Sequence, residues 1–183
     1  LQGHSPGMHV SIGCKDPRRL DRGAAMEGGG TVSFFAGCVD SRIRLVVDSC
    51  SFCTYADSWM AVPHCACGYL PGLLKVADMP DLAGLIAPRG LLVVAGRDDK
   101  LARLSGVREG FEKARRIYRA AGAEDRARLV VGNGGHRFYA AEAWPVIEQM
   151  IADWPSIDDV AEHKPVNPLK NVFFTRVSTF ARD

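Results

Sequence analysis

This 183-residue chain contains, in order, three sites with residue types that together can catalyse acyl transfer. Glu27 stands directly before three consecutive glycines, Asp98 and Asp99 follow a long apolar run, and His136 lies in the glycine-rich loop GNGGHRFY. In a catalytic triad the nucleophile sits on a tight turn, a histidine takes its proton, and an acid orients the histidine. A glycine-rich turn, an acid and a histidine, in this order, match the order of nucleophile, acid and base in one class of triad hydrolases.

A second group of residues, able to bind a metal, surrounds His64. Cys50 and Cys53 form a C-x-x-C pair, and Cys65 and Cys67 follow the histidine in an H-C-x-C pattern, which is compatible with a tetrahedral zinc site. The first pair lies in the apolar segment LVVDSCSFC, where a free cysteine behaves as a small core residue. Both interpretations stay open, buried reduced thiols are favoured, and we expect no metal ion and no cofactor.

The apolar pattern predicts strands that alternate with helices around these residues. HVSIGC is the one strand-like alternation before the glycines. The run LLVVAG, ended by a glycine, is typical of a strand covered on both faces in a parallel sheet. We therefore expect a mostly parallel sheet with flanking helices, whose functional groups collect at the carboxyl ends of the strands. Strands are predicted at 43–47, 91–96 and 128–131, and helices at 31–39, 72–76, 81–86, 144–154 and along the stripe Val107, Phe111, Ala114 and Tyr118.

Composition and charge exclude several classes of partner. The chain has 23 basic and 21 acidic residues, a net charge of +2, and its charges are interleaved as in REGFEKARR. Such a surface has no excess of cations to neutralise phosphates, so nucleic acid is not an expected partner. No apolar run approaches the roughly 20 residues that span a bilayer, and the first residues lack a signal-peptide pattern. We expect a cytoplasmic protein that does not bind membranes.

The segments PGLLKVADMPDLAGLIAPRGLLVVAGRDD and VVGNGGHRFY resemble the α/β-hydrolase superfamily, and specifically its bacterial acetyl-esterase and dienelactone-hydrolase-like branch. The first is similar to the branch's segment that leads to the triad acid, and the second to its histidine loop. The resemblance runs from about Gly28 to about Ile151. It implies Asp99 as the acid, His136 as the base, and Glu27, the residue before the glycines, at the nucleophile position.

The sequence departs from the family pattern around the nucleophile. Glu27 stands where the family carries serine, and Ala25 replaces a glycine two residues earlier. Glu27 is then either a carboxylate at a helix N-terminus, which is favoured, or a carboxylate nucleophile. Only 26 residues precede Glu27, which is too few for the several strands that the family places before this position. The resemblance thus implies a partial α/β-hydrolase fold: an irregular segment 1–27, the C-terminal half of the domain at 28–154, and an extension at 155–183.

Two main functions follow from these observations. The first is a carboxylic ester hydrolase for small-molecule acyl esters, in which Asp99 and His136 are acid and base and Glu27 holds the nucleophile position. The second is a catalytically inactive hydrolase remnant that acts in binding or assembly. A half sheet would expose a strand edge, which favours a homo-oligomer. A zinc-binding protein that uses the cysteine cluster is a third interpretation.

Overall fold

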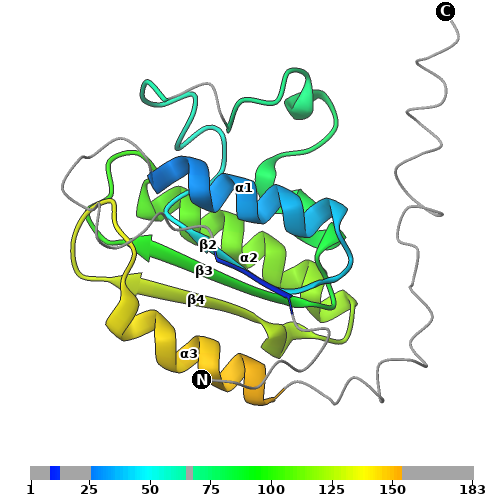
Figure 1. The fold of residues 1–183 in the computed structure, drawn as a ribbon. Helices are drawn as coiled ribbons and strands as arrows, with labels where there is room; N and C mark the ends of the chain where they lie inside the picture. Colours follow the sequence, from blue (N-terminus) through cyan, green and yellow to red (C-terminus); the bar gives the residue numbers. More distant parts are fainter. Residues whose placement is uncertain (1–8, 13–25, 65–67, 154–183) are drawn as a thin grey trace, which may run out of the picture. The chain divides into compact units, whose positions relative to one another are not determined.

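A parallel sheet of four strands forms the centre of the computed structural model, which describes residues 9–12, 26–64 and 68–153 (Figure 1). The strands lie in the order β1-β2-β3-β4, and each neighbouring pair is parallel. This confirms the predicted parallel sheet, and His9–Ile12, the first four residues of the HVSIGC alternation, form the strand at one edge. The bounds of the strands are β1 His9–Ile12, β2 Ile43–Ser49, β3 Gly90–Gly96 and β4 Ala127–Gly132.

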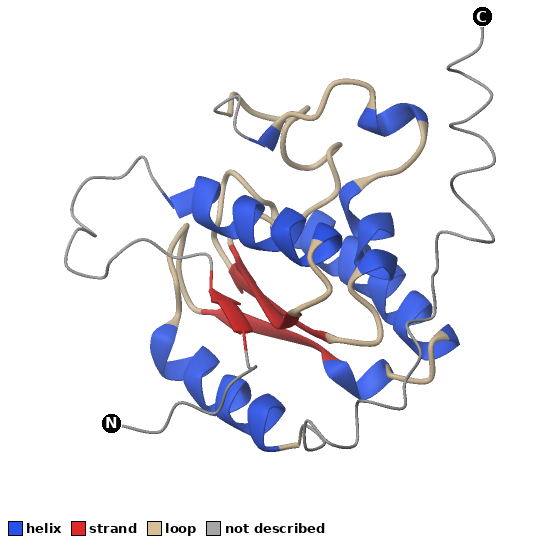
Figure 2. Cartoon of the chain, turned by 45° about the vertical axis from the view of Figure 1, so that its right-hand side comes forward, coloured by secondary structure: helices blue, strands red, loops and turns tan. Residues whose placement is uncertain are grey.

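Helices cover both faces of this sheet (Figures 1 and 2). Helices α1 (Met26–Val39) and α2 (Leu104–Ala120) lie on one face, and α3 (Ala140–Ala152) lies on the other. The strands follow one another in a single direction across the sheet, so right-handed crossovers place α1 and α2 on the same face. The connection from β2 to β3 holds two short 3₁₀ helices, η3 (Leu73–Lys75) and η4 (Met79–Leu85), where long helices serve the other crossovers.

The central strands are buried on both sides. Val46 of β2 and Val93 of β3 pack with the residues of α1, α2 and η4, whereas Leu45, Val47 and Leu92 pack with those of α3. All five side chains have at most 2% exposed surface. This explains the continuous apolar runs in the sequence, because alternate residues enter two different cores. The predicted stripe of α2 is buried as expected, and a short 3₁₀ helix, η5 (Glu124–Arg126), leads from α2 into β4.

The glycines at 28 to 30 do not form the turn that the sequence predicts. Helix α1 begins at Met26, five residues before the predicted start, so these glycines lie within its first turns. A Cβ atom on Gly30 would lie 2.5 Å from the carbonyl oxygen of Ser49 and 2.8 Å from Oγ of Ser51. Glycine therefore lets α1 pack directly on the end of β2, and this close approach explains the residue type at Gly30.

The amino ends of β2 and β3 are joined by a half-buried arginine. Arg89 precedes β3, and its guanidinium donates four hydrogen bonds of 2.7 to 2.9 Å to main-chain carbonyls. Tyr118 of α2, which is fully buried, donates its hydroxyl to the Arg89 carbonyl at 2.8 Å. These bonds hold the end of α1, the start of β2 and the end of η4 together, and the four acceptors are the carbonyl oxygens of Gly37, Asp40, Ile43 and Leu85.

Two further boundaries differ from the expectations. Helix α3 begins at Ala140, four residues before the predicted start, and places Pro145 within the helix. The chain divides into two units, Leu1–Ala152 and Asp153–Asp183, and most of the second lies outside the described residues. The three predicted segments therefore stay a prediction. Within the described ranges, no helix combines the length and the apolar character needed to cross a membrane.

Candidate active site

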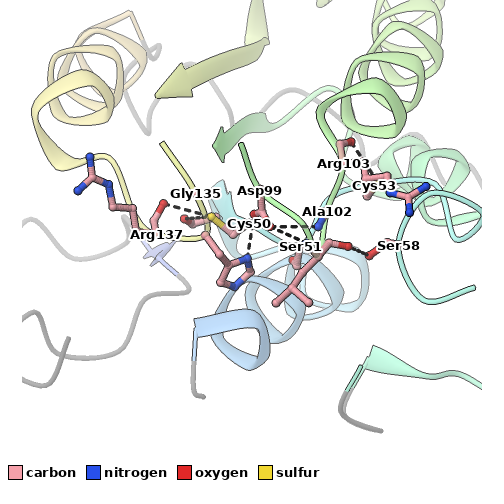
Figure 3. A network of polar contacts seen from close by, with 12 residues as sticks. Cys50, Ser51, Cys53, Ser58, Asp99, Ala102, Arg103, Gly135 and Arg137 are labelled. Atoms are coloured by element: carbon pink, nitrogen blue, oxygen red, sulfur yellow. Dashed lines mark hydrogen bonds and ion pairs between the residues drawn. The ribbon is translucent and has the colours of Figure 1, made fainter. Parts of the chain in front are cut away.

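Asp99 lies in the loop after β3, with a carboxylate that has no exposed surface. Its Oδ1 accepts hydrogen bonds from the main-chain nitrogens of Leu101 at 2.9 Å and Ala102 at 3.3 Å. Its Oδ2 lies 2.8 Å from Nδ1 of His136 (Figure 3 shows Asp99 within this polar network). Because the loop itself holds one carboxylate oxygen, the other is fixed in the direction of the histidine.

Main-chain hydrogen bonds connect the loop that carries Asp99 (the acid loop) to the loop that carries His136 (the histidine loop). Arg97 and Asp98 donate their backbone N–H groups to the carbonyl oxygens of Gly132 and Gly134, at 2.9 and 2.8 Å. These bonds extend the pairing of β3 and β4 beyond the strands, as far as the loop that carries the histidine. The loops of Asp99 and His136 are therefore held at a fixed separation by the backbone.

Close packing within the histidine loop depends on a glycine and a tyrosine. A Cβ atom on Gly96 would collide with the carbonyl oxygen of Gly135. Tyr139 is buried and donates its hydroxyl to this same oxygen at 2.6 Å. The side chain of His136 keeps 19% of its surface exposed, but its Nε2 atom is buried.

The contact of His136 with Asp99 determines which ring nitrogen can act as a base. A carboxylate oxygen accepts hydrogen bonds, so Nδ1 of His136 is the donor and carries the hydrogen in the 2.8 Å contact. In the neutral ring the lone pair then lies on Nε2. This is the arrangement in which an imidazole removes a proton and the acid stabilises the resulting cation.

Cys50 follows β2 and comes close to this pair. Its Sγ, a carboxylate oxygen of Asp99 and a ring nitrogen of His136 all lie within 4.8 Å of one another. The thiol donates to the carbonyl oxygen of Arg137 at 3.1 Å, so it also contacts the histidine loop. Cys50 has a left-handed backbone with φ of 63°, which residues with a Cβ rarely adopt. Burial raises the pKa of the Cys50 thiol to about 12, so the group is neutral near pH 7.

The described members of the predicted zinc cluster have separate partners. Sγ of Cys53 lies 3.8 Å from the carbonyl oxygen of Arg103, and Nε2 of His64 lies 3.2 Å from Oγ of Ser58. Among the described residues, the one group spaced for a metal joins Cys50 to Asp99 and His136, and contains neither Cys53 nor His64. Cys65 and Cys67 lie outside the described residues.

A contact from the β2–β3 connection supports the acid loop. Ser58 is buried and donates its hydroxyl to the carbonyl oxygen of Leu101 at 2.9 Å (Figure 3). Nε2 of His64 lies 3.2 Å from the same carbonyl, and the His64 ring stacks on Trp59 with centroids 5.0 Å apart. Leu101 is also the residue whose N–H binds Asp99. Ser58 thus stabilises the acid loop through a hydrogen bond from the β2–β3 connection. The sequence pattern did not indicate this role.

A second buried carboxylate, Asp48, closes the turn after β2. Its Oδ1 accepts from the main-chain nitrogens of Ser51 at 3.1 Å and Phe52 at 2.9 Å, and Oγ of Ser51 donates to the same carboxylate at 2.8 Å. Burial is the main effect on this group and raises the pKa of Asp48 to about 6, although the hydrogen bonds act in the opposite direction. Asp48 therefore holds the turn that places Cys50.

Glu27 is the second residue of α1, and its side chain lies outside the described residues. The start of α1 lies beside the carboxyl end of β2, because Gly30 packs against Ser49 and Ser51. The backbone of Glu27 therefore lies near the carboxyl ends of the strands, where Asp99 and His136 also lie. Its place as the nucleophile position stays a prediction.

Cys50 and Ser58 were absent from the catalytic group that the sequence predicts. The sequence pattern groups Cys50 with the other cysteines around His64. The available signal was its position, since Cys50 comes directly after β2, just as Asp99 follows β3 by a few residues. The carboxyl ends of neighbouring parallel strands meet at one edge of a sheet, so a residue that follows β2 lies near residues that follow β3.

No protein-family model matches the chain. The "Putative hydrolase YtaP" of Bacillus subtilis is 30% identical over 117 residues, which make up 61% of this chain and 38% of that protein. This chain therefore spans well under half the length of that curated relative.

Solved structures share this part of the fold, among them two esterases. A carbohydrate esterase family 15 glucuronoyl esterase from Caldicellulosiruptor kristjansonii superposes with a TM-score of 0.54 at 18% identity, over 66% of this chain and 39% of that chain. Methylesterase BT1017 superposes with a TM-score of 0.51 at 24% identity, over 67% of this chain and 27% of that chain. The described part of the chain thus has a partial α/β-hydrolase fold, a mostly parallel sheet with flanking helices.

Proposed function

We propose that the chain is a carboxylic ester hydrolase that acts on small-molecule acyl esters. One observation carries the proposal: the buried Asp99 carboxylate lies 2.8 Å from Nδ1 of His136, at the carboxyl edge of a parallel sheet. The relative's name describes a hydrolase and the names of the solved structures describe esterases, which supports the reaction class. Resemblance to the acetyl-esterase and dienelactone-hydrolase-like branch supports short acyl groups as the substrate.

In the proposed reaction, His136 acts as general base and then as general acid. Nε2 takes a proton from the attacking hydroxyl and delivers it to the leaving alcohol, so that one ester and one water give one acid and one alcohol. Asp99 keeps the ring in the required tautomer and stabilises the imidazolium. A positioned base of this kind contributes about 10²- to 10⁴-fold to the rate.

Glu27 holds the nucleophile position in this proposal. A carboxylate in the first turn of α1 is stabilised by the positive end of the helix dipole, which supports a helix-capping role. If Glu27 only caps the helix, water is the group that His136 activates. If Glu27 attacks the ester, an acyl anhydride forms and the alcohol leaves with a proton from the His136 imidazolium. Water then hydrolyses the anhydride and returns a proton to His136.

Hydrolysis of p-nitrophenyl acetate by matched variants tests the acid and the base. His136→Ala and Asp99→Asn each lower the rate by about 10²- to 10⁴-fold. The neighbouring Asp98 is exposed, so Asp98→Asn is the control and keeps the wild-type rate. Equal rates for wild type and His136→Ala would remove His136 from the reaction.

Glu27→Ser separates a working enzyme from an inactive remnant. Serine restores the hydroxyl that the resembled family carries at this position, and His136 would activate it. A wild-type chain without turnover, combined with activity in Glu27→Ser, would identify a hydrolase remnant that has lost only its nucleophile. Absence of turnover in both the wild type and Glu27→Ser would contradict the proposed function and favour the binding alternative.

A further inference from the structure

The thiol of Cys50 lies beside Asp99 and His136 at the edge of the proposed active site. It lies with a carboxylate oxygen of Asp99 and a ring nitrogen of His136 in a group whose atoms are all within 4.8 Å of one another. Cys50 is 3% exposed and Asp99 5%, while the His136 side chain keeps 19% of its surface exposed and its Nε2 atom is buried. The proposed hydrolysis uses Asp99 and His136 and gives the thiol no part.

The backbone of Cys50 indicates that this position of the sulfur is determined by the fold. Its φ of 63° is left-handed, and a residue with a Cβ keeps such a conformation only where its surroundings impose it. The main-chain nitrogen donates to the Val94 carbonyl at 2.9 Å, and the thiol donates to the Arg137 carbonyl at 3.1 Å. Strained positions of this type cluster at ligand and active sites.

A thiolate, an imidazole and a carboxylate are the three ligand types that bind zinc in proteins. In a tetrahedral site their atoms lie roughly 3.3 to 3.6 Å apart, as follows from the usual zinc–ligand distances. The present separations, 2.8 Å between Asp99 and His136 and at most 4.8 Å to the sulfur, require shifts of about an ångström. Three protein ligands and an open fourth position would remain.

We propose that Cys50, Asp99 and His136 form a site for a thiophilic divalent cation such as Zn²⁺, and that the ion blocks the acid–base pair when it binds. The ion replaces the hydrogen bond between Asp99 and Nδ1 of His136. Binding releases the thiol proton of Cys50 to solvent, and the ring proton moves from Nδ1 to Nε2. A ring protonated on Nε2 cannot act as the base, so a bound ion inhibits the proposed hydrolysis.

Cobalt provides a readout that does not require activity. Co²⁺ occupies zinc sites, and a cobalt–thiolate bond gives a charge-transfer absorption in the near ultraviolet. We expect the full chain titrated with Co²⁺ to develop this band, and Zn²⁺ to remove it by displacing the cobalt. Cys50→Ser abolishes the band, and His136→Ala and Asp99→Asn each weaken cobalt binding at least about tenfold.

Two controls separate this site from the other cysteines. Cys53→Ser removes a buried thiol three residues away, whose sulfur contacts the Arg103 carbonyl, and keeps the band. The double variant Cys65→Ser/Cys67→Ser also keeps it. A wild-type chain without the band, a band that survives in Cys50→Ser, or cobalt binding indifferent to His136→Ala would each overturn the site. Circular dichroism of each variant verifies that loss of the band is not loss of the fold.

Inhibition by the bound cation rests on the proposed hydrolysis, whereas the metal site itself does not. If the chain hydrolyses p-nitrophenyl acetate, Zn²⁺ inhibits the wild type, and Cys50→Ser needs at least about tenfold more Zn²⁺ for the same inhibition. Equal zinc sensitivity of wild type and Cys50→Ser would overturn the inhibition. A cobalt band in a chain without turnover would support the site and contradict only the hydrolase function.

Discussion

The two ends of the central strands both hold a charged side chain, and they use it differently. At the amino ends, the Arg89 guanidinium makes its four observed hydrogen bonds to main-chain carbonyls. At the carboxyl ends, Asp99 binds its own loop with one oxygen and His136 with the other. A charge whose partners are all backbone stabilises the fold, whereas one that orients a second titratable side chain can serve a reaction.

Removing the charge at the amino ends is expected to have the largest effect on stability. Arg89→Met leaves four main-chain carbonyls without their donor at a half-buried site, and lowers the free energy of unfolding by about 3 kcal/mol. Arg108 is exposed on α2, so Arg108→Met changes it by less than about 0.5 kcal/mol. Urea denaturation measures both. Similar values for the two variants would show that the Arg89 bonds contribute little.

A pH series tests the buried carboxylate at the opposite ends. The pKa of Asp48 is raised to about 6 in the fold, and an unfolded chain titrates near about 3.9. Between these values the folded chain keeps a proton that the unfolded chain has lost, so this group's contribution to stability falls as the pH rises from about 4 to about 6. Asp48→Asn keeps the hydrogen bonds of the turn and removes this fall.

The expected result for Asp48→Asn is a gain in stability relative to wild type that grows by roughly 2–3 kcal/mol between about pH 4 and pH 6. Urea denaturation at several pH values measures the difference. The exposed Asp125 is the matched control, and Asp125→Asn gives a difference that changes little with pH. A flat difference for Asp48→Asn would contradict the raised pKa.

Gly96→Ala is expected to disturb the proposed acid–base pair by displacing the backbone of the histidine loop. A Cβ atom there would collide with the main chain of Gly134 and Gly135, so the histidine loop has to move. We expect a loss of about 2 kcal/mol in the free energy of unfolding and about 10²-fold in ester hydrolysis. Gly72 has φ of 81° and open space around it, so Gly72→Ala costs about 1 kcal/mol and keeps activity. Unchanged hydrolysis by Gly96→Ala would show that the loop tolerates displacement.

Tyr139→Phe is the mildest test of the histidine loop. It removes a buried hydroxyl that donates to the Gly135 carbonyl at 2.6 Å and leaves the ring in place. The expected cost is about 1 kcal/mol in the free energy of unfolding, measured by urea denaturation. Phe138→Leu changes a neighbouring side chain without a hydroxyl and controls for general loosening of α3. An unaffected stability would mean that the main-chain bonds alone fix the loop.

The strands and the α2 helix were accessible from the sequence because their signals are local. Apolar runs such as LLVVAG reflect burial on both faces, and the stripe of α2 reflects burial on one. The glycines at 28 to 30 misled the prediction because a glycine can serve a turn or a close contact. The reason for Gly30 is its contact with Ser49, a residue on another element, which a local pattern does not contain.

The same limit applies to the candidate site. Chain order and resemblance single out Asp99 and His136, and the structure places them 2.8 Å apart, while their catalytic roles stay predictions. Cys50 joins them through a left-handed backbone conformation, and nothing in the residue type cysteine encodes that conformation. Ser58 reaches Leu101 from a separate crossover, so its contact depends on how the β2–β3 connection folds over the sheet.

The consecutive strand order determines when the hydrogen bond between Asp99 and His136 can form during synthesis. Each strand pairs with the one synthesised just before it, so the sheet can grow from β1 towards β4 as the chain leaves the ribosome. Asp99 follows the third strand and His136 the fourth. The hydrogen bond between them cannot form until β4 has docked, and a nascent chain that ends before residue 136 contains Asp99 without His136.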